Sequence, residues 1–191
     1  MKGEKVVAMI APAIEGQFEG NLEQIKKAIK AVGFTEVVEV AEGAKITAER
    51  EAKELMEKKE KGEGYLATSC CPAWFSLVDK HIPAIRDHIS TTLSPMGYTA
   101  QICKERFPGY KVVFIGPCVA KRYEAATKYP ELIDRVLSYG ELASIFVAKG
   151  VNVADMPKDY EDDDVCRAID DCRDFAVSGG VAECVLSRVD D

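Results

Sequence analysis

Residues 5–12 read KVVAMIAP, an apolar run that ends at a proline. A short continuous apolar run of this length is typical of a strand buried on both faces of a sheet. Pro12 has no amide hydrogen to donate to a ladder, so it predicts a turn directly after the strand. Because Pro12 and Glu15 interrupt the run, we interpret it as the first strand of a domain and not as a signal peptide.

The pattern that follows alternates between strand and helix signals. Residues 22–33 place apolar side chains at helical spacing and stop at Gly33, and residues 46–64 form a charged stretch with Thr47 as its expected cap. Apolar runs that predict strands lie on either side of these helices, at residues 5–10, 36–41 and 64–69. Strand, helix, strand, helix, strand is typical of a parallel sheet with right-handed crossovers.

A second series of elements follows residue 71. A helix is expected after Cys71 and is broken near Pro83, and Ser94-Pro95 is a good opening for another. Ser138 and Glu141 form a capping box for a later helix. Strands are expected at residues 111–116, 135–139 and 175–178, and an acidic linker at residues 156–164. The fold class is therefore α/β, with parallel-sheet lobes flanked by helices.

Composition excludes several function classes. The 191 residues carry a net charge of −7 and a pI near 5.1, which argues against nucleic acid or an anionic membrane as the main partner. No apolar run approaches the length that spans a bilayer. We therefore expect a cytoplasmic protein, in a compartment where thiols stay reduced.

Seven cysteines are many for such a chain, and they show no CxxC pair and no zinc-finger spacing. They are Cys70, Cys71, Cys103, Cys118, Cys166, Cys172 and Cys184. A disulfide between the adjacent Cys70 and Cys71 is unfavourable, because neighbouring Cα atoms lie only about 3.8 Å apart. Metal ligation, thiol chemistry and plain burial remain open for each thiol.

Two of the expected strands, residues 64–69 and 111–116, each end next to a cysteine and a proline. Ligands of parallel α/β sheets bind at the carboxyl ends of strands, so Cys71 and Cys118 can face one crevice. Separate packing of the two thiols is the alternative. Side chains alternate along an extended chain, so Cys70 and Cys71 are expected to point different ways and to do two different jobs.

Lys121 follows Cys118 by three residues and Glu124 by six, so a helix starting near Cys118 presents all three on one face. A lysine there can neutralise a thiolate or an anionic cofactor. The alternative is an ordinary exposed Lys–Glu pair.

The strings TSCCPAW (68–74) and PCVAKRYE (117–124) resemble the first two signature motifs of the iron-only hydrogenases. Further similarity runs along nearly the whole chain in order: KVVAMIAPAI, GAKITAEREA, ISTTLSPM, RVLSYGELASIF and FAVSGGVAECVL. The resemblance implies a cofactor made of a 4Fe–4S cubane joined through a cysteine to a di-iron unit. Four cysteines hold it, one from each of these two motifs and two from a third motif.

The resemblance also implies roles for individual residues. Cys71 and Cys118 would ligate the cubane, and Cys70 would relay protons to Glu51, with Glu49 as the second choice, and then to Ser90. Lys121 would bind a cyanide of the di-iron unit, with Glu124 supporting it. Pro12 and Pro117 would line the di-iron pocket. Heterolytic cleavage of H2 needs such a base and proton path beside an open metal site.

Two positions depart from the catalytic members. Gly116 stands where most have methionine, and Met96 stands where glutamine is common, which is similar to divergent or sensor-type branches. Retention of Cys70 favours a catalytic role. No sequence resembling the third motif precedes Asp191, so Cys166, Cys172 and Cys184 are expected to be structural, and the chain supplies half of the thiolates.

By this interpretation residues 1–68 form a truncated α/β lobe and residues 69–191 a complete one that carries both motifs. The exposed sheet edge of a truncated lobe favours self-association. The first hypothesis is thus a fragment of a hydrogenase catalytic domain, inactive alone, that works with a ferredoxin-like electron carrier or an accessory iron–sulfur domain. The alternatives are a non-catalytic iron–sulfur or redox-sensing module of the same family, and a cofactor-free α/β interaction domain.

Overall fold

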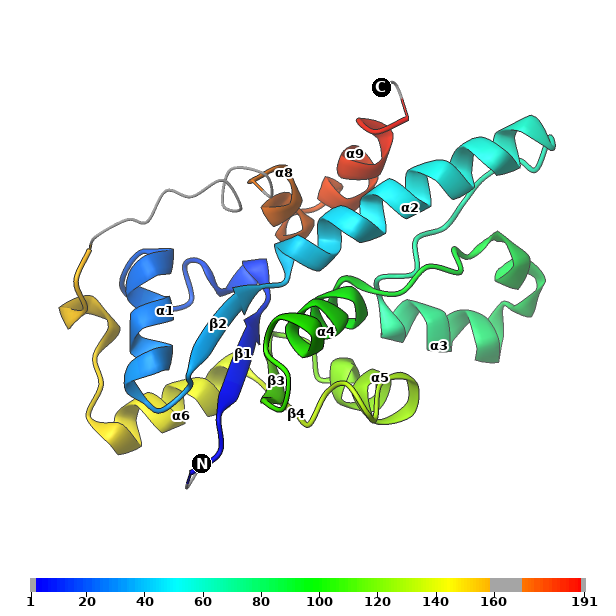
Figure 1. Cartoon of the computed structure of the whole chain (residues 1–191). Helices are drawn as coiled ribbons and strands as arrows, with labels where there is room; N and C mark the ends of the chain where they lie inside the picture. Colours follow the sequence, from blue (N-terminus) through cyan, green and yellow to red (C-terminus); the bar gives the residue numbers. More distant parts are fainter. Residues whose placement is uncertain (1–2, 159–169, 190–191) are drawn as a thin grey trace.

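The computed structural model describes residues 3–158 and 170–189, and its centre is a four-stranded parallel sheet flanked by helices (Figure 1). The strands are β1 (Val6–Ile10), β2 (Glu36–Glu39), β3 (Lys111–Ile115) and β4 (Arg135–Leu137), in the order β2-β1-β3-β4. The expected α/β class is confirmed.

β1 is the strand on which the rest of the sheet is built. All five of its residues are buried, as the unbroken apolar run VVAMI predicts. It pairs in parallel with β2 from Val7↔Glu36 to Ile10↔Glu39, and with β3 from Val6↔Lys111 to Ile10↔Ile115. Its side chains alternate between two apolar clusters, one on each face of the sheet.

The face of the sheet that carries Ala8 and Ile10 is covered by α1 (Leu22–Ala31) and α6 (Tyr139–Lys149). Each of these helices begins with a capping box, at Asn21 and at Ser138, so the expected cap at Ser138 is confirmed. A capping box satisfies amide donors that the first helical turn leaves without partners, which fixes where each helix starts.

The opposite face, with Met9 and Phe114, packs against α4 (Pro95–Arg106) and α5 (Ala120–Lys128). Ser94 caps α4, as expected, since its hydroxyl accepts a hydrogen bond from the amide of Gly97 at 3.3 Å. Cys103 of α4 lies fully buried in this apolar cluster, which is the structural use of a thiol.

A long helix, α2 (Ala41–Glu60), leaves the carboxyl end of β2 and packs on α4 (Figure 1). The expected start at Thr47 is wrong by two turns. Thr47 is buried inside the helix, where its hydroxyl donates to the carbonyl oxygens of Gly43 and Leu93. A Cβ atom on Gly43 would lie 2.3 Å from the carbonyl oxygen of Pro95, so glycine permits the close approach of the two helices.

The third strand expected at residues 64–69 is not part of the sheet. This segment makes one isolated parallel bridge, between Ala67 and Ile89. The expected division into two lobes at residue 68, each with its own strands, is also wrong. β1 and β2, which precede residue 68, belong to the same sheet as β3 and β4, which follow it. Apolar composition indicates a strand, but pairing with a partner that lies far away in sequence decides which sheet it joins.

The remaining elements are helices outside the sheet. They are η1 (Pro12–Ile14), α3 (Pro72–His81), η2 (Pro83–His88), η3 (Val153–Asp155), α8 (Asp170–Arg173), η4 (Asp174–Ala176) and α9 (Gly180–Leu186). The expected break at Pro83 is confirmed by the separation of α3 from η2. The strand expected at residues 175–178 is wrong, since η4 and a turn occupy that stretch.

Most of the expected acidic linker, and Cys166, lie outside the described residues. Within residues 3–158 and 170–189, no helix combines the length and apolar character needed to cross a bilayer.

We expect Gly43→Ala to lower the free energy of unfolding by about 1–3 kcal/mol, because the added methyl group forces α2 away from α4. Gly140→Ala is the matched control, since Gly140 also lies in a helix but has open space around it. That control should change stability by about 1 kcal/mol at most, in the stabilising direction. Urea unfolding of the wild type and of both variants measures these changes. A Gly43→Ala variant as stable as Gly140→Ala would contradict the argument that α2 and α4 need glycine for their close approach.

Candidate functional site

The parallel register of β1 and β3 places the ends of these strands side by side. The amide of Ala11 donates to the carbonyl oxygen of Ile115 at 2.9 Å, one residue beyond the last paired positions. The buried Tyr139 hydroxyl donates to the carbonyl oxygen of Ala11 at 3.2 Å and so holds the turn before Pro12. The loops that leave the two strands therefore start from one fixed edge of the sheet.

A cavity of about 190 Å³ opens at this edge. The predicted site residues Pro12, Cys70, Pro117, Cys118 and Lys121 all line it. The rest of its wall is mainly apolar and comes from Ala11, Ala13, Val40, Ala44, Pro95, Met96, Phe114, Phe175, Ala176 and Val181. Residues that lie far apart in the sequence thus meet at the strand ends, where parallel sheets place their ligands.

Cys70 and Cys71 lie in different surroundings. Cys70 is half-buried and lines the cavity, whereas Cys71 is exposed and caps α3, accepting a hydrogen bond from the amide of Trp74 at 3.4 Å. Burial raises the pKa of the Cys70 thiol, a hydrogen bond with Thr68 opposes this, and the charge of Glu51 raises it further. Cys70 is therefore held as a protonated thiol.

Lys121 connects the two cysteine segments. Its ammonium group donates to the carbonyl oxygen of Cys70 at 3.0 Å and to Glu124 at 2.7 Å. The side chains of Lys121 and Glu124 are only 12% and 2% exposed, so the alternative of an ordinary surface pair is wrong. Removing one member would leave a buried charge without its partner, which is costly.

Glu51 is fully buried on α2 beside the first cysteine segment. Its Oε1 atom accepts hydrogen bonds from the amide of Ser69 at 2.8 Å, from the Ser69 hydroxyl at 3.2 Å and from Thr92 at 3.4 Å. Its Oε2 atom has no hydrogen-bond partner among the described residues. Burial raises the pKa of Glu51; the hydrogen bonds from Ser69 oppose the shift, and the charge of Glu54 adds to it.

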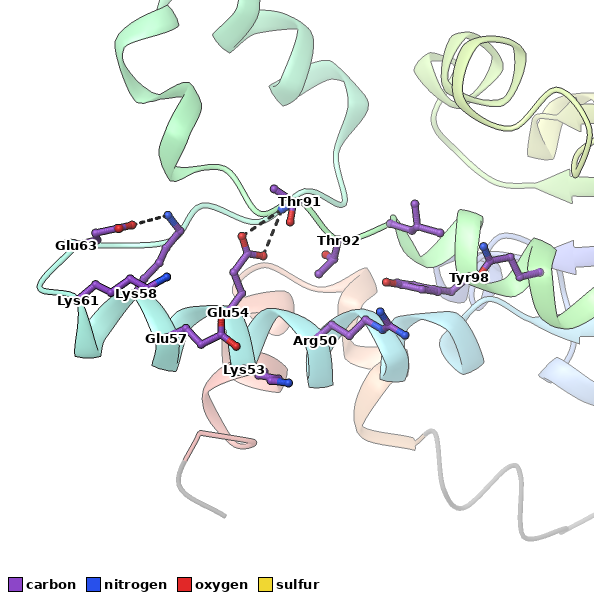
Figure 2. A pocket seen from close by; sticks show the side chains of 12 residues that line it. Arg50, Lys53, Glu54, Glu57, Lys58, Lys61, Glu63, Thr91, Thr92 and Tyr98 are labelled. Carbon is purple, nitrogen blue, oxygen red and sulfur yellow. Dashed lines mark hydrogen bonds and ion pairs between the residues drawn. The ribbon is translucent and has the colours of Figure 1, made fainter.

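Hydrogen bonds run from Glu51 to the surface. Ser90 donates its hydroxyl proton to Glu54 at 2.7 Å, and the Thr92 hydroxyl lies 2.9 Å from the Ser90 oxygen and 3.4 Å from Glu51 Oε1. Because Thr92 has a single hydroxyl proton, it donates to either Ser90 or Glu51 at one time. Figure 2 shows Glu54 and Thr92 in a groove of about 790 Å³ that also contains Arg50, Lys53, Lys58 and Lys61. The structure thus brings Glu51 and Ser90 into one polar chain. Glu49, the second choice for the carboxylate, is exposed.

Sequence reasoning missed Thr92 and Glu54. Glu54 lies three residues after Glu51, so both can occupy one side of a helix, and this spacing is the signal that was available. Thr92 carries no comparable signal, because only the fold of the segment before α4 brings it next to Glu51.

The departure at Gly116 has a local structural reason. A Cβ atom there would lie 2.6 Å and 2.7 Å from two ring carbons of Phe114, so the Phe114 ring fills the space that a side chain at position 116 needs. Met96 is buried in the same cavity wall. The cavity wall is therefore apolar at Met96 and at Phe114.

The described residues contain no cluster of three or more His, Cys, Asp or Glu side chains that could hold a metal ion by itself. Cys118 lines the cavity, whereas Cys71 is exposed and is not among the residues that line it. Two thiols fit the donor chemistry of an iron–sulfur cluster, but they make up half of a four-thiolate set.

Glu51 gives a prediction for pH-dependent stability. Burial holds its folded-state pKa above the ordinary 4.5, so the folded chain binds this proton more tightly than the unfolded chain. The free energy of unfolding should therefore fall as pH rises from about 4.5 through the folded-state pKa. Glu51→Gln should lack this part of the slope, whereas exposed Glu49→Gln should keep it. Urea unfolding across pH measures both, and parallel curves for Glu51→Gln and wild type would refute the assignment.

Comparisons with known proteins give the family. The model of the iron only hydrogenase large subunit, C-terminal domain, matches residues 4–191. The chain is 29% identical to the periplasmic iron hydrogenase large subunit of Nitratidesulfovibrio vulgaris, over 95% of this chain and 49% of that protein. It is 31% identical, over 61% of its length and 25% of the relative, to the cytosolic Fe-S cluster assembly factor NAR1 of Meyerozyma guilliermondii.

Solved structures show the same fold. A variant of the FeFe-hydrogenase HydA1 from Chlamydomonas reinhardtii superposes with a TM-score of 0.79 at 24% identity, covering 97% of this chain and 53% of that one. The chain spans about half the length of the Nitratidesulfovibrio vulgaris hydrogenase subunit, 49% of which is covered by the match. With the family model covering almost every residue, the chain belongs to the family of the iron only hydrogenase large subunit, C-terminal domain.

Proposed function

We propose that this chain provides the part of an iron-only hydrogenase site that ligates a 4Fe–4S cubane through Cys71 and Cys118 and receives the di-iron unit in the 190 Å³ cavity. The observation that carries the proposal is the convergence of Cys70, Cys118 and Lys121, from two distant motifs, on one apolar cavity at the strand ends. Apolar walls with a few converging polar groups are typical of cofactor sites.

The side chains present fit the cofactor in kind. Thiolates are the usual ligands of iron–sulfur clusters, and the half-buried Cys118 and exposed Cys71 are both available. Lys121 supplies a largely buried positive charge at the cavity, which suits anionic ligands of a metal. When bound, the cofactor supplies the open metal site at which H2 is cleaved or formed.

The protein's own part is to hold and move protons. Cys70 keeps a proton on its Sγ atom at the cavity, because burial raises its thiol pKa. Glu51, also with a raised pKa, can take up a proton at Oε2, the atom without a hydrogen-bond partner among the described residues. Thr92, Ser90 and Glu54 extend the polar chain to the surface groove. General acid–base groups work best with a pKa near the ambient pH, and the upward shift of the Glu51 pKa is in that direction.

We further propose that the chain alone is inactive. The 191 residues contain two of the four thiolates that the family's cofactor needs, and the other two would come from polypeptide outside this sequence. A ferredoxin-like carrier or accessory iron–sulfur domain would supply electrons in the complete protein. The proposal also includes association of the chain with a second copy of itself and a location in the cytoplasm.

A second candidate is a non-catalytic iron–sulfur or redox-sensing module of the same family. It is favoured by the apolar side chains of Met96 and Phe114 in the cavity wall, and by the similarity to the Fe-S cluster assembly factor NAR1. Retention of Cys70 with Glu51 and Ser90 in one region favours the catalytic candidate. The cofactor-free interaction domain is the third possibility, which the next experiment separates from both.

Anaerobic reconstitution with iron and sulfide tests the ligand assignment. We expect the wild-type chain to take up iron, with a buffer thiol or a second copy completing the coordination, and Cys71→Ser and Cys118→Ser to lose most of it. Cys103→Ser is the matched control, because Cys103 is a buried thiol in the α4 core. Iron content and visible absorption measure the outcome. Equal iron in all four proteins would favour the cofactor-free domain.

Hydrogen evolution tests the expected inactivity. The reconstituted 191-residue chain, supplied with a chemical reductant, should produce no hydrogen above the level of the Cys118→Ser variant. Sustained evolution that depends on Cys70 and Cys118 would show that the chain completes its own cofactor site, and would overturn the proposal of an inactive half-site.

A further inference from the structure

Two cysteines that the hydrogenase motifs do not use lie against each other. The Sγ atoms of Cys172, in α8, and Cys184, in α9, are 3.4 Å apart. Both side chains are buried, and neither forms a disulfide in this structure. A disulfide has its sulfur atoms about 2.05 Å apart, so a shift of little more than about 1 Å would join them.

An arginine lies at both sulfur atoms. Arg188 places Nη1 at 3.0 Å from the Cys184 sulfur and Nη2 at 3.4 Å from the Cys172 sulfur. The same Nη1 donates to the carbonyl oxygen of Cys184 at 2.7 Å, which fixes the guanidinium in place. A cation beside a thiol favours the thiolate, which is the nucleophile in thiol–disulfide exchange.

The segment between Cys172 and Cys184 forms part of the cavity wall. η4 (Asp174–Ala176) lies between the two cysteines in sequence, and its Phe175 and Ala176, with Val181 of α9, line the cofactor cavity. α8 and α9 both pack on α2, as Figure 1 shows. A Cβ atom on Gly180 would lie 1.8 Å from the carbonyl oxygen of Asp174. The backbone at the start of α9 therefore packs directly against the backbone of η4.

One end of this segment is held to the sheet. Arg173, next to Cys172, donates to both carboxylate oxygens of Glu39 at 2.7 Å and 2.9 Å, and Glu39 ends β2. A bond between Cys172 and Cys184 would therefore tie α9 to a point that is itself anchored on the sheet. The segment that carries Phe175 and Ala176 would then be held on one side by the anchored Cys172 and on the other side by Cys184.

We propose that Cys172 and Cys184 are a dithiol–disulfide pair that, when oxidised, fixes residues 172–184 over the cofactor cavity. The oxidant is a low-molecular-weight disulfide such as oxidised glutathione. When α8 or α9 opens locally and exposes one of the buried sulfur atoms, that protein thiolate attacks the glutathione disulfide and releases one glutathione thiol. The second protein thiolate then displaces the other glutathione and forms the Cys172–Cys184 bond. Two electrons pass from the protein to the glutathione disulfide, and the two protons end on the two glutathione thiols.

This pairing differs from the two ordinary uses of buried cysteine. Inert burial does not require two sulfurs in contact beside a guanidinium, as the isolated thiol of Cys103 shows. Metal ligation at these two sulfurs is disfavoured because the positive charge of Arg188 occupies the position facing both of them. The redox chemistry of the pair does not depend on iron binding at Cys71 and Cys118.

The first experiment is a redox equilibration of the metal-free, chelator-treated 191-residue chain. The protein is incubated anaerobically in buffers with rising ratios of oxidised to reduced glutathione, quenched with acid, alkylated and mapped by peptide mass. We expect the Cys172–Cys184 disulfide to form at lower ratios than any other pair, and Cys103→Ser to behave like the wild type. Arg188→Gln should slow its formation by about tenfold relative to Arg188→Lys.

The second measurement follows the cavity. In the oxidised chain, alkylation of Cys118, which lines the cavity, should slow about fivefold, while alkylation of exposed Cys71 stays unchanged. Cys184→Ser should abolish the difference between oxidising and reducing buffers. If Cys184→Ser fails to fold, the alkylation rate of Cys118 in the wild type is compared between the oxidising and the reducing buffer instead.

The proposal is overturned by failure to form this disulfide at any ratio, by preferential pairing of Cys70 or Cys118, or by an oxidised chain whose Cys118 reacts as fast as in the reduced one. Binding of zinc that is lost in both Cys172→Ser and Cys184→Ser would also overturn it. Because none of these readouts uses iron, failure here is distinguishable from failure of the cluster assignment.

Discussion

The hydrogen-bond register between β1 and β3 is the constraint on which the site depends. Ile10 pairs with Ile115, and the amide of Ala11 extends the ladder by bonding to the Ile115 carbonyl oxygen, so Pro12 and Pro117 leave the sheet from the same edge. A shift of register by one residue would send alternate side chains to the wrong face of the sheet and separate the two loops. The complete burial of β1 fixes the register, because each of its side chains fills one of two apolar clusters.

Burial at this edge also decides the chemistry of the acidic groups. Glu51 and Cys70 have raised pKa values because both lie away from water; the charge of Glu51 adds to the shift at Cys70, and the charge of Glu54 adds to the shift at Glu51. Lys121 is directed to the Cys70 carbonyl oxygen and to Glu124, so its charge orders the cysteine segment without making the thiol a thiolate. The same low-dielectric setting thus keeps protons on the relay groups and strengthens the ion pair that positions them.

The sequence predicts local features of this structure well and long-range pairings poorly. Apolar runs, the capping box at Ser138 and the Ser94-Pro95 opening are local signals, and the structure contains each of them. The stretch from Gly64 to Ser69 has the composition of a strand, but among the described residues its one bridge joins Ala67 to Ile89, and the sheet is made of β2, β1, β3 and β4. At the site, recognisable motifs identified the thiols and Lys121. Thr92, and the contact of Cys172 with Cys184, depend on tertiary packing that no spacing rule encodes.

The exchange at position 116 shows how the cavity can change without losing its scaffold. Gly116 follows β3 directly, and its amide bonds to the carbonyl oxygen of Leu137, so the backbone there is fixed by the sheet. With the backbone fixed, only one side chain can occupy the adjoining space, and here it is the Phe114 ring. A thioether at position 116 would therefore require the Phe114 ring to move out of that space. The two positions form one packing unit, and a rigid aromatic wall gives the cavity less freedom to adapt its shape than a methionine would.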